Sequence, residues 1–514
     1  MNQDLVIGID SSTTATKAIA WTAAGEAVAE GRAPIPLSNP RPSYFEQDPA
    51  DWWGSTVTAI RQVLDRVPPE RIAAVAVSNQ RETFGVFDTD GTPIRPAMVW
   101  LDERARPQVK AFSAAFGEDR VHAISGKPRD LTPCLYRFVW LRECEPRTFE
   151  RIGKIAEVHA FLTYRFTGEW VTSTASADPL GVLDMARMGW SGDILGAAGL
   201  REDQFSRLVR PGTVMGAVHQ AAAAETGLAI GTPVVAAGGD GQCAGTGTAT
   251  LRAGRAYVNL GTAVVSGSYG EGYLHDKAFR TMSAVAEGGY IYESCLRTGT
   301  FLVDWTVRTL MGADPRQDPG IFAALEAEAA ALPIGAGGLA LVPYWSGVMT
   351  PHWDPGARGI VAGLSSSHKR GHVYRALLEG IALEQAMVTD RIDAATGAPV
   401  DHYLAIGGGA SSDLWCQILA DASRRAVVRS KTVEASSLGA AMAAARGAGW
   451  YGSIGEAARA MAGEAVATFE PDPRRQARYA ELLGIYADLW PTVAAWNERL
   501  VQFADADAGG SGHA

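Results

Sequence analysis

The first twenty-one residues constrain the fold of this chain more than any other segment. Leu5 to Ile9 is an apolar run of strand length that ends in the carboxylate of Asp10. Four hydroxyl residues follow, and a second apolar run, which contains Lys17, returns toward Trp21. Backbone N–H and hydroxyl groups in such a turn suit the oxygens of a polyphosphate, a nearby lysine adds positive charge, and a carboxylate suits Mg²⁺. The segment predicts a phosphate-binding strand–turn–strand unit or, alternatively, an ordinary hairpin with a polar turn.

A similar pattern returns about half the chain later. Residues 255–267 again consist of a strand, a turn at Gly261 and Thr262, and a returning apolar run. The two segments share the pattern and not the residues, so the repeat is unspecific by itself. Two similar domains that each present a hairpin to one nucleotide across a cleft would have the arrangement of the actin-like ATPase fold. We therefore expect an α/β chain of two domains.

The bulk composition limits the classes of protein to which the chain can belong. Its 514 residues exceed what one hydrophobic core usually covers. A formal net charge of −10 argues against nucleic acid and against an acidic membrane surface as partners. No apolar run reaches membrane-spanning length, and the N-terminus lacks the regions of a signal peptide. Five scattered cysteines without C-x-x-C spacing argue against disulfides and zinc, and favour a reducing cytoplasm.

Strands alternate with helical stretches along the chain, which is typical of an α/β architecture. The sequence predicts buried strands at 72–78 and 233–240, and strands that run into turns at 85–91 and 404–410. It predicts helices at 146–167, 371–389, 413–423 and 435–445. The helix from 435 is rich in small residues, so we expect it to pack very closely on a neighbour. The final segment, residues 501–514, is expected to be disordered.

Two polar motifs contain groups that could recognise a polyol. Arg81 and Glu82 follow a buried strand and offer a fork of donors beside a pair of acceptors, which neighbouring hydroxyl groups require. Trp100 offers an indole ring to the C–H face of a sugar. The alternatives are a solvated surface ion pair for Arg81 and Glu82, and a structural salt bridge for Asp102 and Arg104, which follow Trp100.

Two glycine-rich motifs follow predicted strands. Asp240 stands between glycines, so a hydroxyl group can approach its carboxylate closely and give up its proton during phosphoryl transfer. The alternative is that Asp240 caps a helix. Gly407 to Ala410 precede a predicted helix and let the backbone approach a flat or charged ligand. By itself the second motif is unspecific.

These motifs occur in an order that resembles a known family. Supporting motifs lie at Phe45–Pro49 with Trp52, at Leu183–Asp184 with Trp190–Ser191, and at Pro351–Gly359 continuing through Gly363–Leu364 to Arg375, Glu379 and Gly380. The chain thereby resembles, from about residue 4 to 495, the FGGY carbohydrate kinases, which include glycerol kinases, xylulokinases and ribulokinases. The resemblance implies two RNase H-like domains, residues 1–248 and 249–500, with ATP and Mg²⁺ in the cleft between them.

The resemblance also implies a role for individual residues. Asp10 matches the metal-facing acid and Asp240 the catalytic base. The other matches are Thr13, Thr14, Gly261 and Thr262 as phosphate-contacting residues, Gly409, Ala410 and Asp413 as the adenosine site, and Arg81, Glu82 and Trp100 as the sugar pocket. Gln242 joins the candidate substrate-binding residues and Lys17 joins the candidate ATP-binding residues. A homodimer is usual in the family.

The motifs divide between the subgroups of the family. Asn79–Thr83 is similar to glycerol kinases, whereas Thr148–Gly168 and Leu183–Ser191 are more similar to xylulokinases. We therefore expect an ATP-dependent kinase that acts on a pentulose or a C4–C5 polyol, with glycerol as the second candidate. Two other classes stay open: a non-catalytic regulator or scaffold, and an actin-like filament or chaperone ATPase. The presence of Asp10 and Asp240 argues against the former, and the candidate polyol pocket argues against the latter.

Overall fold

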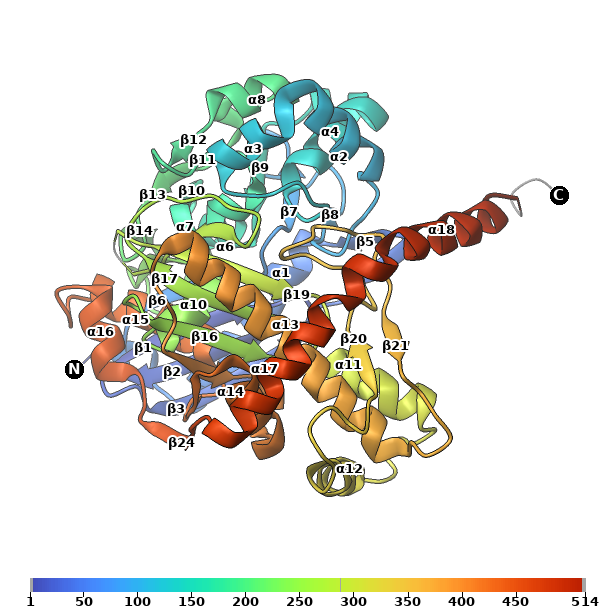
Figure 1. Cartoon of the computed structure of the whole chain (residues 1–514). Coiled ribbons are helices and arrows are strands. Elements are labelled where there is room, and N and C mark those ends of the chain that lie inside the picture. Colours follow the sequence, from blue (N-terminus) through green and yellow to red (C-terminus); the bar gives the residue numbers. More distant parts are fainter. Residues whose placement is uncertain (1–2, 287, 511–514) are drawn as a thin grey trace.

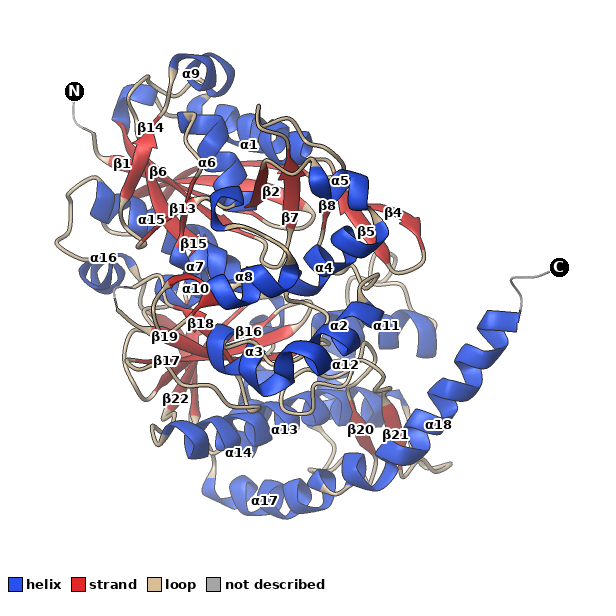
Figure 2. Cartoon of the chain, turned by 90° about the horizontal axis from the view of Figure 1, so that it is seen from above, coloured by secondary structure: helices blue, strands red, loops and turns tan. Residues whose placement is uncertain are grey.

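The computed structural model describes residues 3–286 and 288–510, the last six of them by their backbone alone. Two large β-sheets form the centre of the molecule, and helices cover them (Figures 1 and 2). A further group of helices and short strands, inserted after the early strands of the first sheet, forms a cap at the top of Figure 1. The predicted α/β fold class is confirmed.

The first sheet has the strand order β14-β15-β6-β1-β2-β3. Its strands are β1 (Leu5–Ser11), β2 (Ala15–Thr22), β3 (Ala27–Pro34), β6 (Ile72–Asn79), β14 (Val214–Ala217) and β15 (Pro233–Gly239). β1 and β2 form the predicted hairpin, and β6 runs parallel to both β1 and β15. The carboxyl ends of these three parallel strands therefore meet at one edge of the sheet, where Asp10 lies beside Ser78 in register. Ligands of open α/β sheets bind at such an edge.

The second sheet repeats this arrangement. Its order is β18-β19-β17-β16-β22-β23-β24, and it is formed by β16 (Arg255–Leu260), β17 (Val264–Gly270), β18 (Arg280–Ser283), β19 (Tyr290–Leu296), β22 (His402–Ile406), β23 (Ala426–Ser430) and β24 (Ala465–Phe469). The hairpin β16–β17 is antiparallel and β22 lies parallel to β16, as β6 lies parallel to β1. The similarity that was only a pattern in the sequence is thus a repeat of topology.

Helices bury the two sheets. The first sheet is covered by α1 (Pro49–Leu64) and α6 (Val158–Thr167), whose apolar residues join those of the strands in one core. The second sheet is covered by α13 (Arg370–Thr396), α14 (Asp413–Ser423) and α17 (Pro473–Ala487). α13 was predicted at 371–389 and continues to Thr396, because the chain offers no helix breaker before Gly397, which takes a left-handed conformation.

The remaining elements build the cap and the connections. The cap contains a five-stranded sheet of β4 (Ser38–Arg41), β5 (Tyr44–Gln47), β7 (Phe84–Phe87), β8 (Ala97–Met98) and β9 (Lys154–Glu157), and the helices α2 (Arg106–Phe112), α3 (Glu118–Ser125), α4 (Cys134–Cys144), α5 (Pro146–Glu150) and α8 (Gly192–Ala198). Elsewhere lie β10 (Val171–Ser173), β11 (Leu183–Asp184), β12 (Gly189–Trp190), β13 (Arg207–Val209), β20 (Ala340–Val342), β21 (Ile360–Ala362), α7 (Thr174–Ala177), α9 (Gln220–Thr226), α10 (Asp240–Gly247), α11 (Thr300–Trp305), α12 (Ile321–Ala330), α15 (Ala435–Gly447), α16 (Ile454–Met461) and α18 (Leu489–Gly510). No helix among the described residues is long and apolar enough to cross a membrane.

The prediction of one helix at 146–167 is wrong. α5 ends at Glu150, β9 follows, and α6 begins at Val158. Two features explain the interruption: β9 pairs with β7, and the Glu157 carboxylate accepts a hydrogen bond from the Ala160 amide and so caps a new helix. An apolar run of this kind does not by itself distinguish a buried strand from a helix.

The expectation of a disordered tail is also corrected in part. α18 continues through residues 501–510 and projects from the body of the molecule (Figure 1). Apolar residues at helical spacing, Trp496, Leu500 and Phe503, extend the helical pattern into this segment. Residues 511–514 lie outside the described part of the chain.

The small-residue helix α15 packs on the first sheet and on α10, although it follows the second sheet in the sequence. Ser437 of α15 donates a hydrogen bond from its hydroxyl to the carbonyl oxygen of Gly8 (2.9 Å). A Cβ atom added at Gly8 would lie 2.0 Å from the backbone oxygen of Ser437, and one added at Gly439 would lie 1.9 Å from that of Cys243. The close packing predicted from small residues is confirmed.

Replacing Gly8 with alanine is expected to lower the free energy of unfolding by about 2 kcal/mol, because the new methyl group has no room against the α15 backbone. The same change at Gly54, a position in α1 with nothing within 4 Å, should instead stabilise the protein by about 0.5–1 kcal/mol. Urea unfolding of both variants measures the difference. Equal stabilities would contradict the packing described here.

Candidate active site

Asp10 lies at the carboxyl end of β1 with its carboxylate partly buried. The Ser78 hydroxyl donates a hydrogen bond to Oδ1 (2.9 Å). Burial, and next the negative charge of Asp240, raise the pKa of the Asp10 carboxyl from 3.8 to about 7. The carboxylates of Asp10 and Asp240 thus offer oxygen ligands to a divalent cation, whose charge would offset the effect of Asp240 on Asp10.

The turn after Asp10 is held by side chains of the cap. The Trp100 indole Nε1 donates to the Thr13 hydroxyl (2.8 Å), and the Gln47 amide donates to the Thr13 carbonyl oxygen (2.6 Å). The side chain of Thr14 is exposed. Trp100 therefore connects the candidate sugar pocket directly to the candidate phosphate turn, a link that the sequence did not reveal.

Lys17 has a partner of its own. Its ammonium group lies 2.5 Å from a carboxylate oxygen of Glu434, the residue that precedes α15. Both side chains are about one quarter exposed. The charge predicted to lie near the phosphates is therefore already balanced by an acid from the other half of the chain.

Gly261 and Thr262 form the turn between β16 and β17. The amides of Thr300 and Phe301, at the start of α11, donate to the carbonyl oxygens of Gly261 (2.8 Å) and Thr262 (3.4 Å). The Thr262 side chain is exposed. This turn corresponds in topology to the turn after Asp10, since each joins the hairpin strands of its own sheet.

Gly409 and Ala410 lie in a short 3₁₀ turn after β22, and Asp413 begins α14. Arg429 of β23 donates to the Ala410 carbonyl oxygen and to the Asp413 carboxylate, both at 2.6 Å. The Asp413 side chain is 78% exposed, so its carboxylate faces solvent beside the guanidinium. Gly407 has a φ of 83°, a conformation that favours glycine, and it allows the chain to turn beside Leu260 at the end of β16.

Asp240 begins α10 where β15 ends, and its side chain is 39% exposed. Its Oδ1 accepts a hydrogen bond from the Gly241 amide (2.7 Å) and faces the Arg81 Nε at 2.8 Å. A Cβ atom at Gly241 would lie 2.7 Å from a Glu293 carboxylate oxygen, so a larger residue next to Asp240 would displace the Glu293 carboxylate. The Asp240 carboxylate is thus accessible to solvent, oriented by the Gly241 amide and paired with the positively charged Arg81.

Arg81 and Glu82 are buried and paired across the two sheets. Arg81 Nη1 donates to both carboxylate oxygens of Glu293 (2.9 and 2.8 Å), and Arg280 Nη1 donates to Glu82 Oε1 (2.7 Å). The surface ion pair considered as an alternative is therefore excluded. The salt bridge considered for Asp102 and Arg104 is present, with a shortest separation of 2.7 Å.

Gln242 lies in α10 with 1% of its surface exposed. Its amide nitrogen donates to the Ala175 carbonyl oxygen (2.8 Å), whereas its buried Oε1 has no hydrogen-bond partner among the described residues. An unpaired buried acceptor is costly and calls for a donor. Because this oxygen could accept a hydrogen bond from a substrate hydroxyl group, Gln242 remains a candidate substrate-binding residue.

Family models match most of the chain. The N-terminal domain of the FGGY family of carbohydrate kinases matches residues 5–247, and the C-terminal domain of the same family matches residues 242–448. The chain belongs to the FGGY family of carbohydrate kinases. As a member of this family it is an ATP-dependent sugar phosphotransferase with two RNase H-like domains.

Relatives of this FGGY kinase span nearly its whole length. The xylulose kinase of Bacillus subtilis (strain 168) is 30% identical, over 97% of this chain and 99% of the relative. A glycerol kinase of Pseudarthrobacter chlorophenolicus is 30% identical, over 89% of this chain and 92% of the relative. The crystal structure of xylulose kinase from Rhodospirillum rubrum has a TM-score of 0.88 at 27% identity, over 96% of this chain and 99% of that one.

Glu293 and Arg280, the partners of Arg81 and Glu82, were not among the site residues expected from the sequence of this FGGY kinase. Glu293 stands alone as a charge inside the otherwise uncharged strand Tyr290–Leu296, and Arg280 begins the neighbouring strand. Burying a charged residue in the middle of a strand costs free energy unless the charge is paired. The single glutamate in this strand was therefore the signal that could have predicted a buried partner for Arg81.

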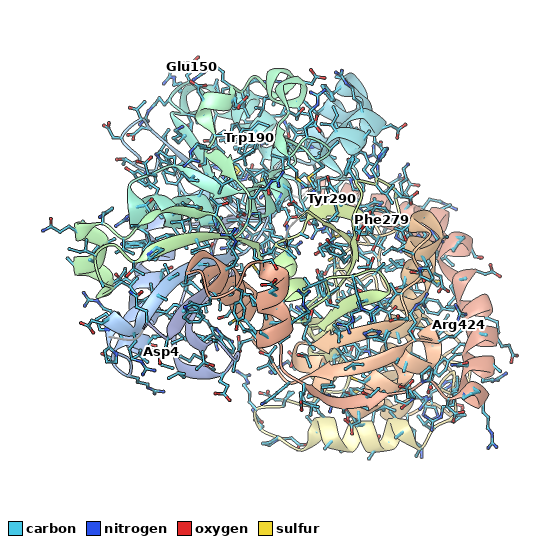
Figure 3. All side chains as sticks on the ribbon, turned by 90° about the vertical axis from the view of Figure 1, so that its left-hand side faces the viewer. Asp4, Glu150, Trp190, Phe279, Tyr290 and Arg424 are labelled. Carbon is cyan, nitrogen blue, oxygen red and sulfur yellow. The ribbon has the colours of Figure 1, made fainter. Side chains whose placement is uncertain are left out.

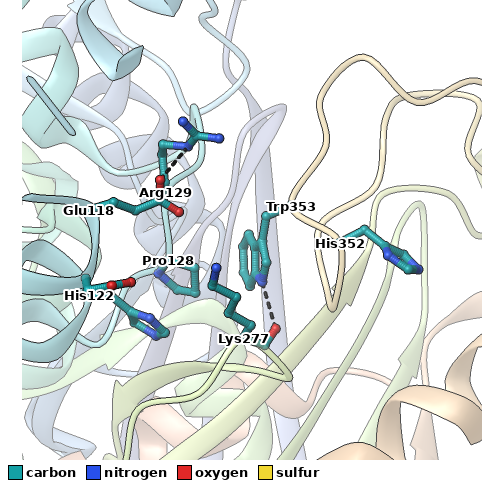
Figure 4. Close-up of a pocket in the computed structure, with 8 residues that line it drawn as sticks. Glu118, His122, Pro128, Arg129, Lys277, His352 and Trp353 are labelled. Atoms are coloured by element: carbon teal, nitrogen blue, oxygen red, sulfur yellow. Dashed lines mark hydrogen bonds and ion pairs between the residues drawn. The ribbon is translucent and has the colours of Figure 1, made fainter. Parts of the chain in front are cut away.

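A cavity of about 120 Å³ lies elsewhere on the kinase (Figure 4). It is lined by Glu118, Asp119, His122, Pro128, Arg129, Lys277, His352 and Trp353. Arg129 pairs with Glu118 (3.3 Å), and the Trp353 indole donates to the Lys277 carbonyl oxygen (2.7 Å). None of the predicted site residues lines it.

Proposed function

We propose that this FGGY kinase transfers the γ-phosphoryl group of ATP to a hydroxyl group of a pentulose of the xylulose or ribulose type, or of a C4–C5 polyol. The xylulose kinase of Bacillus subtilis, which spans nearly the whole chain, supports the first acceptor. The observation that carries the proposal is the edge of the first sheet, where the carboxyl ends of three adjacent parallel strands present Asp10, Asp240 and the neighbouring residues Arg81 and Glu82. Glycerol is the second candidate for the acceptor, and it is supported by a glycerol kinase relative and by the Asn79–Thr83 motif.

In this proposal Asp240 orients the acceptor hydroxyl and accepts its proton, which the partly exposed carboxylate at a helix start can reach. Arg81, Glu82 and the unpaired Oε1 of Gln242 bind the other hydroxyl groups, and Trp100 forms an apolar wall. The phosphates are assigned to Thr13, Thr14, Lys17, Gly261 and Thr262, and adenosine to Gly409, Ala410 and Asp413. Enclosure of the sugar between the domains would exclude water and limit ATP hydrolysis.

Asp10 is proposed to face Mg²⁺. The carboxylate fits a hard cation, since burial first, and then the negative charge of Asp240, raise the pKa of Asp10, and a bound cation would favour its ionised form. When bound with ATP, the ion would neutralise charge on the transferring phosphoryl group. The chain's own contribution is to hold the Asp10 carboxylate in place through the Ser78 hydroxyl.

The division into residues 1–248 and 249–500 is supported by the sheets, since the first ends with β15 and the second begins with β16. We further propose a cytoplasmic homodimer. The five cysteines are free, which suits a reducing compartment, and four of them are buried.

The experiment that tests this function is ADP release with Mg-ATP across a panel of pentuloses, tetritols, pentitols and glycerol. We expect turnover with a pentulose or with a C4–C5 polyol. Turnover with glycerol alone would make the Arg81–Glu82 loop the better guide to the acceptor. Silence across the whole panel from a folded protein that binds ATP would contradict the proposal.

A further inference from the structure

Glu293 is a buried carboxylate of the second sheet that reaches into the first domain. It lies in β19, whose first residue, Tyr290, is labelled in Figure 3, and its side chain has no exposed surface. Besides Arg81, its oxygens accept hydrogen bonds from Arg280 Nε (2.7 Å) and from the Tyr257 hydroxyl (2.9 Å). Burial alone would raise its pKa, but the guanidinium groups of Arg81 and Arg280 lower the pKa of Glu293 to about 2. It is therefore a permanent negative charge.

The contacts of Glu293 continue to Glu82. Arg280 and Glu293 are cross-strand partners in β18 and β19, and Arg280 also donates to the Glu82 carboxylate (2.7 Å). Arg81, Glu82 and Arg280 each expose 7–8% of their side chains. Solvent screens the charges of such buried pairs only weakly. Arg81 and Glu82, which follow β6 of the first sheet, are thus both held by charged residues of the second sheet.

The geometry divides the Arg81 guanidinium between two carboxylates. Nη1 is held by Glu293, and Nε faces Asp240 at 2.8 Å. Because a guanidinium is planar and rigid, fixing one nitrogen fixes the direction of the other two. The contacts described for Arg81 use Nη1 and Nε, and the one described for Glu82 uses Oε1, so Arg81 Nη2 and Glu82 Oε2 are the atoms left to meet a ligand.

We propose that Glu293 is a positioning residue for the sugar site. This inference rests on the proposed function of Arg81 and Glu82 in binding the acceptor hydroxyl groups. Glu293 orients Arg81 directly and Glu82 through Arg280, so that a carboxylate of one domain aligns the sugar-facing groups of the other. Neither Glu293 nor Arg280 needs to touch the sugar for this role.

The first test is Glu293→Gln, which keeps the shape of the side chain and removes its charge. We expect the dissociation constant of the sugar that the wild type phosphorylates, measured by calorimetry, to rise about tenfold, because Arg81 loses its charged anchor. The KM for ATP should change less than about twofold, since the candidate nucleotide residues lie elsewhere. A purely structural defect would not separate the two substrates in this way.

The matched control is Asp393→Asn. Asp393 forms a largely buried ion pair with Arg425 (2.6 Å) within the second domain, and its other carboxylate oxygen accepts a hydrogen bond from the Val400 amide. This variant loses the same kind of interaction but should keep the wild-type sugar affinity. Equal losses of sugar affinity in the two variants would overturn the proposal.

A double-mutant cycle tests whether Glu293 acts through Arg81. If it does, the loss of sugar affinity on adding Glu293→Gln to Arg81→Ala should be clearly smaller than the tenfold loss expected in the wild-type background, because only the route through Arg280 to Glu82 remains. If the two losses multiply instead, Glu293 does not act through Arg81 and the proposal fails.

Two further measurements keep the test decisive if Glu293→Gln does not fold or if no sugar is turned over. Tyr257→Phe removes a neutral hydrogen bond to the same carboxylate and keeps every charge, and it should weaken sugar binding about threefold. Hydrogen exchange of residues 80–84 without ligand should be faster in Glu293→Gln, or in Tyr257→Phe where the former is unfolded, than in Asp393→Asn. A wild type that phosphorylates no sugar contradicts the proposed function alone. Unchanged sugar affinity and unchanged exchange in these variants overturn the role of Glu293.

Discussion

Replacing Asp240 with asparagine is expected to lower kcat for sugar phosphorylation by about 10³-fold. Asparagine has nearly the same shape and can keep the contact with the Gly241 amide, but it cannot accept a proton from the substrate hydroxyl. Arg81 remains paired with Glu293 in the variant, so the local structure should persist. ATP affinity should stay close to that of the wild type because the candidate nucleotide residues are untouched.

The measurement is ADP release at saturating sugar and ATP, together with calorimetric titration of ATP. Asp193→Asn is the control, since it removes a carboxylate that is 64% exposed and pairs with Arg120 on the surface of the cap. That variant should turn over at the wild-type rate. Turnover of Asp240→Asn within threefold of the wild type would mean that another group accepts the proton.

The parts of the site that depend on local sequence could be predicted. Asp10 lies at the end of β1, the turn from Ser12 to Thr14 joins β1 to β2, and Asp240 follows β15. These positions were predictable because an apolar run bounded by small or polar residues predicts a strand and its end within a few residues. The same reasoning placed Gly261 between β16 and β17 and Asp413 at the start of α14. Each of these positions follows from residues that are its neighbours in the chain.

The partners of these residues could not be predicted, because they are set by packing between distant segments. Arg81 meets Glu293 across 212 residues, and Lys17 meets Glu434 across 417. No local pattern specifies which acid a buried guanidinium will find. The sequence therefore predicted that Arg81 has hydrogen-bonding capacity to offer, while the structure shows that most of it is already used.

Metal-free Asp10→Asn is expected to be more stable than the wild type near pH 8 while its kinase activity falls by about 10³-fold. The pKa of Asp10 is raised from 3.8 to about 7, first by burial and then by the charges of Asp240 and Glu434. Between pH 3.8 and about pH 7, the folded protein holds a proton on Asp10 that the unfolded chain has already released. The contribution of Asp10 to the free energy of unfolding is therefore lost as the pH rises through this range. Three pKa units set a limit of about 4 kcal/mol, and partial exposure reduces the expected gain to about 2 kcal/mol.

Thermal unfolding in EDTA at pH 4.5 and pH 8 measures the effect as a difference between Asp10→Asn and the wild type, which cancels the other titrating groups. The two proteins should have similar stability at the lower pH and diverge at the higher one. Adding Mg²⁺ with ADP at pH 8 should then stabilise the wild type more than the variant, because a cation offsets the charge that asparagine no longer carries. A variant that is less stable than the wild type at pH 8 without metal would show that the Asp10 charge is already compensated within the protein. In that case the hydrogen bond from Ser78, and not a bound cation, would be what stabilises the Asp10 carboxylate at the edge of the sheet.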